Sequence, residues 1–170
     1  QRALKIKKFL NFCSKTGRLA YGSISNNLGV IIVANSSGIF QRQKYTSLEY
    51  EITVNKDGGY GKAVGYSYKD DLNIDEINEN AVKKSDLSRN PIEIKPERYS
   101  VIIEPLAVSE ILPFFGYLGF NALAYYEKRS FACDNLGKKI FSDLLTIYDD
   151  PSEISYPTLL FDMEGMPRKK

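Results

Sequence analysis

The order of the predicted elements places this chain in the α+β class, with mainly antiparallel sheets and two or three main helices. Three observations lead to this prediction: helical spacing of apolar residues at the start, a series of period-two segments after it, and tight-turn sequences between those segments. The chain has 170 residues, 43% of them hydrophobic and 12% aromatic. This composition is typical of one average domain or two smaller ones, and it excludes a disordered chain.

The first part of the chain is predicted to form a helix followed by strands. The helix covers residues 3–13, because Ile6, Phe9 and Leu10 recur at helical spacing, and Thr16-Gly17 ends it. Turn-forming residues are expected to separate the strands at 26–29, at 35–38 and at Asp57-Gly58-Gly59, with a kink near Thr46-Ser47. The predicted strands are 18–26, 30–34, 39–46, 48–54 and 60–69.

A second helix is predicted to run from residue 74 to residue 84. Asn73 is followed three residues later by Glu76, which is the spacing of a capping box. The sequence Asn90-Pro91 then interrupts any regular element, and we place a domain boundary there. The two predicted parts are 1–91 and 92–170.

The second part is predicted to contain short strands around a third helix. Residues 92–104 have a strand-like pattern, and Pro105 suits the first turn of a helix, where its missing N–H costs nothing. We expect this helix to be broken or bent near Pro113 and Gly116. Further strands are predicted at 144–148 and 158–161.

The chain contains no histidine, and this absence excludes several kinds of active site. A Ser-His-Asp or Cys-His nucleophile pair cannot be built, nor can an imidazole zinc site. Acid–base chemistry must come from other side chains or from a partner. The two cysteines, Cys13 and Cys133, form no C-x-x-C motif and indicate small buried thiols in a reducing compartment.

Charge and hydropathy argue against nucleic-acid and membrane partners. The formal net charge is only +2, which predicts no nucleic-acid binding. Residues 105–126 are long enough to cross a bilayer, but Glu110, Pro113 and Gly116 interrupt the apolar run, so we expect a buried or interface helix. The first residue is Gln1, so we expect the natural start to lie upstream.

Two short motifs could carry chemistry, and each has a structural alternative. Residues 59–65 (GYGKAVG) resemble a phosphate loop, but the third glycine is one residue late and the segment lies within a strand, so we interpret it as part of a hairpin. Four acidic residues near the end of the chain could form an oxygen-ligand cluster for Mg²⁺ or Ca²⁺, or could simply form turns. They are Asp149, Asp150, Asp162 and Glu164.

Several stretches, taken in order, resemble the TldD/PmbA family, also called modulators of DNA gyrase. They are 33–38 (VANSSG), 59–61 (GYG), 90–96 (NPIEIKP), 136–143 (LGKKIFSD) and 161–168 (FDMEGMPR). No single stretch is specific, but their shared order and spacing cover nearly all of the chain. The resemblance implies that residues 1–91 match the family's central domain and residues 92–170 the first part of its C-terminal domain, as in a fragment of a longer protein.

The resemblance also implies where catalytic residues would stand. TldD-like members are zinc metallopeptidases with an H-E-x-x-x-H helix, whereas PmbA-like members lack these residues and pair with a TldD-like partner. Here Pro105 and Glu110 occupy the two histidine positions, and Leu106 occupies the position of the base. The resemblance therefore implies no catalytic, cofactor or metal residue in this chain, with zinc only in an H-E-x-x-x-H partner.

The expected function is that of a PmbA-like, non-catalytic subunit of a cytoplasmic zinc peptidase, acting on peptides or unfolded proteins as a dimer with a TldD-like subunit or with itself. The aromatic residues Phe114, Phe115, Tyr117 and Phe120 exceed what one small helix buries, so we assign them to the core or to a subunit interface. The alternative is a homodimeric binding or scaffold protein that retains the family fold without peptidase activity. Direct action on gyrase or DNA rests on the historical name alone.

Overall fold

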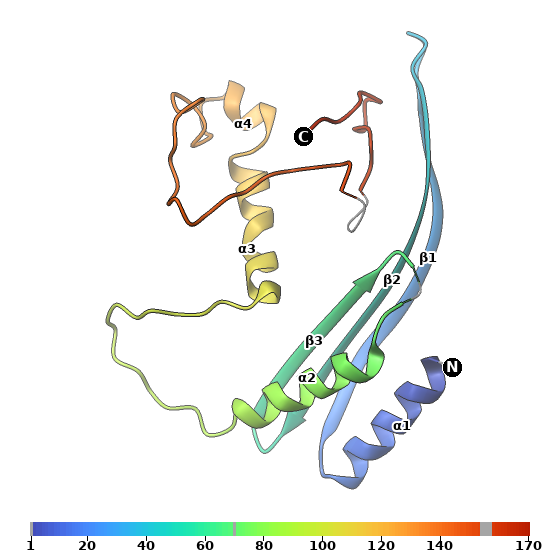
Figure 1. The fold of residues 1–170 in the computed structure, drawn as a ribbon, viewed down its shortest axis with the longest axis vertical. Helices are drawn as coiled ribbons and strands as arrows, with labels where there is room; N and C mark the ends of the chain where they lie inside the picture. The colour runs from blue at the N-terminus through green and yellow to red at the C-terminus, as the bar shows by residue number, and fades with distance from the viewer. Residues whose placement is uncertain (1, 70, 154–157) are drawn as a thin grey trace. The chain divides into compact units, whose positions relative to one another are not determined.

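The computed structural model of the chain describes residues 2–69, 71–153 and 158–170, and it confirms the α+β class (Figure 1). One compact unit comprises residues 1–94 with 149–170, and the other comprises 95–148. The elements of the first unit are α1 (Arg2–Lys15), β1 (Leu19–Ala34), β2 (Phe40–Lys56), β3 (Gly59–Ser67) and α2 (Ile74–Leu87). The second unit contains α3 (Pro105–Leu118) and α4 (Ala122–Tyr126).

The sheet of the first unit is antiparallel, with β2 between β1 and β3. Two tight turns set its register. Asn35 closes the first, where its side-chain oxygen accepts hydrogen bonds from the backbone N–H groups of Ser37 and Ile39. Asp57 and Gly58 form the second with φ values of 51° and 80°, as expected for an Asp-Gly hairpin. Both predicted turns are therefore confirmed.

The predicted interruptions inside the first hairpin are wrong. β1 runs without a break through residues 26–29, and β2 runs through Thr46 and Ser47. Each residue of the polar stretch has a partner in the other strand, since Asn27 pairs with Ser47 and Gly29 pairs with Tyr45. Asn27 also donates a side-chain hydrogen bond to Ser47 Oγ at 3.2 Å. A continuous ladder outweighs the local preference of Asn and Gly for turns.

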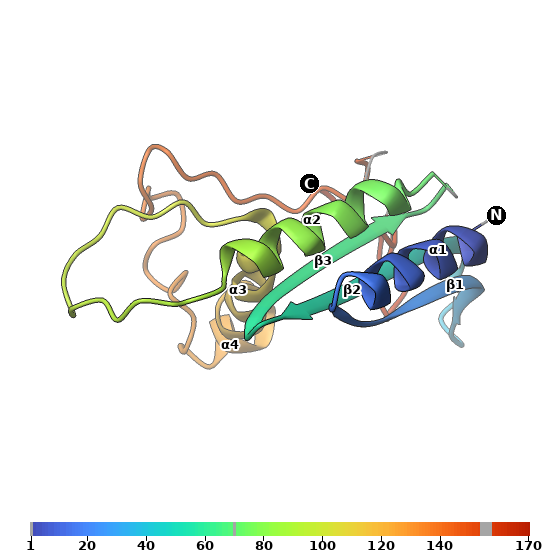
Figure 2. The ribbon, with the colours of Figure 1, turned by 90° about the horizontal axis from the view of Figure 1, so that it is seen from below.

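Helices α1 and α2 lie on the same face of the sheet (Figure 2) and close the core. Ile6 and Phe9 of α1 pack against this core, whereas Leu10 of the same predicted apolar series is 41% exposed. The buried side chains of this core come from β2, β3 and α2. They are Tyr50, Ile52, Val54, Ala63, Ile74 and Ala81. Asn73 caps α2 as predicted, because its side chain accepts a hydrogen bond from Glu76 N and donates one to the Glu76 carboxylate.

Small residues on alternate positions of β3 allow α2 to approach the sheet closely. Gly59, Gly61 and Gly65 all point toward α2, where a Cβ atom would collide with the helix. The buried hydroxyl of Ser85 donates a hydrogen bond to Gly59 O at 3.0 Å. The GYGKAVG segment is thus a strand that supports a helix, in agreement with the hairpin interpretation.

The C-terminal segment of the first unit is held against the β1–β2 hairpin by a side chain. Gln43 of β2 donates a hydrogen bond to Thr158 O and accepts one from Leu160 N, both at 2.9 Å. The predicted strand at 158–161 is wrong, because the segment forms only an isolated bridge between Phe161 and Pro167. The Gln43 side-chain amide, and not the backbone of a neighbouring strand, makes the hydrogen bonds to the backbone of Thr158 and Leu160.

The second unit has fewer regular elements than the sequence predicts. Residues 92–104 and 144–148 form no strand, and the sheet of the described residues contains only β1, β2 and β3. α3 begins at Pro105 as predicted and continues through Pro113 and Gly116 to Leu118, so a break is absent. The alternative, a bend near these residues, stays a prediction. Pro113 has no backbone N–H to donate, but the residues on either side of it remain helical.

Candidate functional site

The three positions that the family resemblance singled out lie in the first two turns of α3. Pro105 is the first helical residue, and Val108 N donates a hydrogen bond to Glu104 O at 3.0 Å. Leu106 is half-buried, whereas Glu110 is exposed. The start of the helix is therefore well formed, and its side chains can be judged as possible ligands.

These side chains do not fit a zinc ion. Pro105 has no donor atom, Leu106 can neither bind a metal nor accept a proton, and Glu110 is the single charged residue of α3. One exposed carboxylate does not provide the three or four ligands that a zinc site needs. Among the residues that the structure describes, no group of three or more His, Cys, Asp or Glu side chains is placed to hold a metal ion.

The aromatic run after these positions divides into two environments. Phe115 is half-buried and makes edge-to-face contacts with Phe131 and Phe141, with ring centroids 6.1 Å and 6.0 Å away. Phe120 is 51% exposed, although its ring lies 4.9 Å from that of Phe131. Phe114 and Tyr117 are 63% and 78% exposed. Phe115 therefore anchors a local core, and the assignment of the other three to a subunit interface remains a prediction.

The whole of α3 is unusually apolar and unusually exposed. None of its residues is buried in the described structure. Its exposed apolar residues include Val108, Ile111, Leu112 and Leu118 in addition to the aromatic ones. A helix that is apolar on all sides is typical of one that other segments cover. No helix within the described ranges is long and apolar enough to cross a membrane.

The acidic residues near the end of the chain belong to turns. Asp149 pairs with Arg168, and Asp162 accepts hydrogen bonds from the backbone N–H groups of Glu164 and Met166. Asp150 accepts a hydrogen bond from the Ser152 hydroxyl and pairs with Lys170 at 2.9 Å. The Ser152 bond, with the help of Lys170, lowers the pKa of Asp150 to about 2. Asp149, Asp150 and Asp162 thus each have a partner within the C-terminal segment, which supports the turn interpretation over a metal cluster.

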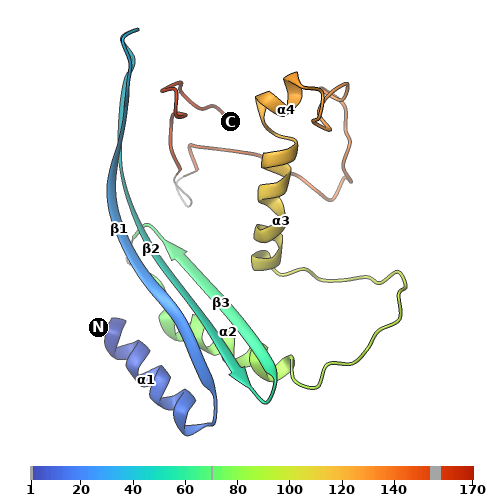
Figure 3. The same ribbon diagram turned by 180° about the vertical axis from the view of Figure 1, so that it is seen from behind.

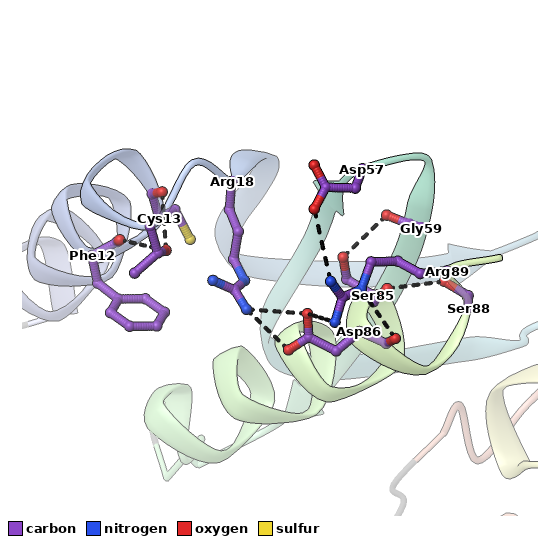
Figure 4. A network of polar contacts seen from close by, with 10 residues as sticks. Phe12, Cys13, Arg18, Asp57, Gly59, Ser85, Asp86, Ser88 and Arg89 are labelled. Carbon is purple, nitrogen blue, oxygen red and sulfur yellow. Dashed lines mark hydrogen bonds and ion pairs between the residues drawn. The ribbon is translucent and has the colours of Figure 1, made fainter.

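A polar network around Arg18 and Asp86 was not predicted from the sequence (Figure 4). Arg18, whose side chain is only 11% exposed, donates two hydrogen bonds to the Asp86 carboxylate at 3.0 Å and 3.1 Å. Arg89 lies between Asp86 and Asp57, with N···O distances of 3.4 Å and 3.7 Å. The network joins the end of α1, the β2–β3 turn and the end of α2. Its partners are up to 68 residues apart, so no local sequence pattern reveals it.

Cys13 lies beside this network and is buried. Burial raises the pKa of its thiol, and the nearby Arg18 charge offsets part of that increase. Burial likewise raises the pKa of Tyr50, whose hydroxyl donates a hydrogen bond to Asn78 at 2.7 Å. Neither group faces a ligand-sized cavity together with a base, so we interpret both as structural.

Both parts of the chain match domains of one class of metallopeptidase-related proteins. Residues 2–88 match the PmbA/TldA metallopeptidase central domain, and residues 96–170 match the PmbA/TldA metallopeptidase C-terminal domain. The chain therefore belongs to the PmbA/TldD family, as the sequence resemblance predicted.

Two curated relatives are similar to most of the chain. A metalloprotease PmbA homolog of Haemophilus influenzae is 28% identical over 154 residues, covering 85% of this chain and 33% of the relative. An uncharacterized protein of Methanocaldococcus jannaschii is 24% identical over 131 residues, covering 76% of this chain and 30% of the relative. The chain thus spans about a third of the length of these relatives. The comparison with solved structures gave no significant match.

Proposed function

We propose that this chain is part of a PmbA-like, non-catalytic subunit of a TldD/PmbA-type zinc peptidase. A TldD-like partner with an H-E-x-x-x-H helix would supply the zinc ion and the base. The complex would act on peptides or unfolded proteins in the cytoplasm. The single observation that carries this proposal is the donor set at the start of α3, where Pro105, Leu106 and Glu110 offer one carboxylate.

Family membership supports the peptidase context of this proposal, and the exposed apolar surface of α3 supports a role in assembly. Phe114, Tyr117 and Phe120 are aromatic side chains of the kind enriched at the centres of protein interfaces. A subunit that supplies no zinc ligand would use such residues to contact the partner that does.

The test is a peptidase assay of the purified protein, alone and mixed with the H-E-x-x-x-H paralogue from the same source, with zinc quantified by mass spectrometry. We expect no stoichiometric zinc and no hydrolysis from the protein alone, and hydrolysis in the mixture. One bound Zn²⁺ per chain in the protein alone would overturn the proposal. A stable homodimer that ignores the paralogue would instead support the binding or scaffold alternative.

A substitution of Glu110 separates a structural role of α3 from a chemical one. Glu110→Gln keeps the size of the side chain and removes its charge, so the activity of the mixture should not change if the base belongs to the partner. Tyr117→Ala, on the exposed surface of the same helix, should weaken recovery of the mixed complex in co-purification. Loss of activity in Glu110→Gln with an intact complex would assign a catalytic role to this chain.

A further inference from the structure

β1 forms a long free edge of the sheet (Figures 1 and 3). Its 16 residues (LAYGSISNNLGVIIVA) include no charged residue and no proline. Edge strands in natural proteins usually carry such residues because they prevent pairing with further strands. The opposite edge, β3, is shorter and carries Lys62. Within the part of the chain that the structure describes, no strand pairs with the outer side of β1. Among the described residues, the outer backbone donors and acceptors of β1 therefore have no strand partner.

A groove runs beside this edge, between α1 and β1. Its volume is about 570 Å³, and Ile6, Lys7 and Leu10 of α1 face Ile24 and Asn26 of β1 across it. Leu10 and Ile24 are 41% and 39% exposed, so they form an apolar floor that water reaches. A helix that lies beside an edge strand is the arrangement in which peptide-binding domains accept an extended peptide as an added strand.

The charge of α1 defines the kind of segment that fits this groove. The helix contains five basic residues and no acidic one, namely Arg2, Lys5, Lys7, Lys8 and Lys15. Lys5 pairs with Asp75 of α2 at 2.5 Å, and Lys8 lines a separate groove between α1 and α2. Lys7 lies on the wall of the α1–β1 groove. The groove thus combines an apolar floor with a positive rim, which complements an acidic segment.

We propose that the α1–β1 groove binds an extended acidic peptide segment as a fourth strand of the sheet. Backbone hydrogen bonds to β1 supply affinity without demanding a sequence, and Lys7 selects for negative charge. This inference rests on the proposed function, in which peptides or unfolded proteins are the substrate. A second copy of the chain is a less favourable occupant. If β1 of one copy paired antiparallel with β1 of another, the two basic α1 helices would lie on the same side of the joined sheet and repel each other.

The test measures binding of fluorescein-labelled peptides to the purified protein by anisotropy, without the paralogue and without zinc. The probe is a Val-Glu peptide of about ten residues whose alternate positions, on the strand face toward the groove, carry both Val and Glu. It is long enough to cover roughly 33 Å of β1. A Val-Lys peptide and a Val-Glu peptide with N-methyl groups on alternate residues are the controls. We expect binding of the Val-Glu peptide only, because N-methylation removes the strand hydrogen bonds.

Two adjacent lysines of α1 provide matched variants, since both are exposed and each substitution changes the net charge equally. Lys7→Glu should weaken binding of the Val-Glu peptide about fivefold, and Lys8→Glu should leave it unchanged. Circular dichroism checks that both variants are folded. Equal effects of the two substitutions, or equal binding of the N-methylated peptide, would refute the proposal.

Hydrogen exchange distinguishes the other occupants of the edge. If β1 is protected in the protein without peptide, a second copy or another strand of a longer protein already occupies it, and the proposal is wrong. If β1 becomes protected only when the Val-Glu peptide is added, the added-strand model is supported. Because this assay needs no catalysis, its failure is separate from failure of the peptidase proposal.

Discussion

Gly61 is the position at which the packing of the first unit is most easily tested. A Cβ atom there would lie 2.8 Å from Lys84 Cβ and closer still to Ala81 O and Ser85 N, so Gly61→Ala places a methyl group against the backbone of α2. The backbone of a helix cannot rotate away as a side chain can. The helix must shift as a body, which strains the buried bond from Ser85 Oγ to Gly59 O.

The expected magnitude follows from three opposing contributions. Overpacking of a tight core costs about 1–3 kcal/mol. Weakening the Ser85–Gly59 hydrogen bond adds about 1 kcal/mol. Replacing Gly by Ala within a strand stabilises the folded state by about 0.5–1 kcal/mol, because Ala loses less backbone entropy on folding. We therefore expect Gly61→Ala to lower the free energy of unfolding by about 2 kcal/mol.

Gly65, on the same face of β3, is the matched control. A Cβ atom there would mainly meet Ile77 Cδ1, the end of a side chain that can change rotamer at a cost of about 1 kcal/mol. The gain in backbone entropy nearly offsets this cost. Urea unfolding followed by far-UV circular dichroism measures both variants, since the chain has no Trp. Equal stability of Gly61→Ala and Gly65→Ala would refute the close-approach argument.

Three further predictions concern the polar groups. Asp86→Ala should destabilise the protein by about 2 kcal/mol in urea unfolding, because it leaves the largely buried Arg18 without its anion. The pKa of Asp150 is lowered in the folded state from 3.8 to about 2, so its contribution to stability is present above about pH 4 and is lost as the pH falls toward 2; a carboxyl NMR titration midpoint near 4 would contradict this. Cys13 should react with a thiol reagent only after unfolding, whereas Cys133, which is half-buried, should react faster in the native protein.

The parts of the fold that depend on local chemistry could be predicted from the sequence. Residues 3–13 have a clear helical period, and Asp57-Gly58 fixes a tight turn through backbone angles that few other residues accept. The N-cap of α2 could likewise be predicted from the sequence, because Asn73 and Glu76 interact within one helical turn. In each case the partners lie close together in the chain.

The errors came from positions whose structure depends on distant partners. Asn27 and Gly29 favour turns locally, but their partners in β2 keep them in a strand. Residues 92–104 have a strand-like sequence, yet a strand requires a neighbour, and no described segment supplies one. The Arg18–Asp86 pair was missed for the same reason, since nothing in either local sequence identifies the other residue.

By itself, the sequence determined the class of the fold, the family and the absence of an imidazole side chain among these 170 residues. The absence of histidine and the residues at positions 105, 106 and 110 are properties of composition and order, and no folding can change them. Only the tertiary structure decided which residues meet. It turned the glycines of β3 toward α2, left β1 as a free edge beside a basic helix, and exposed α3, because these features depend on contacts between segments that lie far apart in the chain.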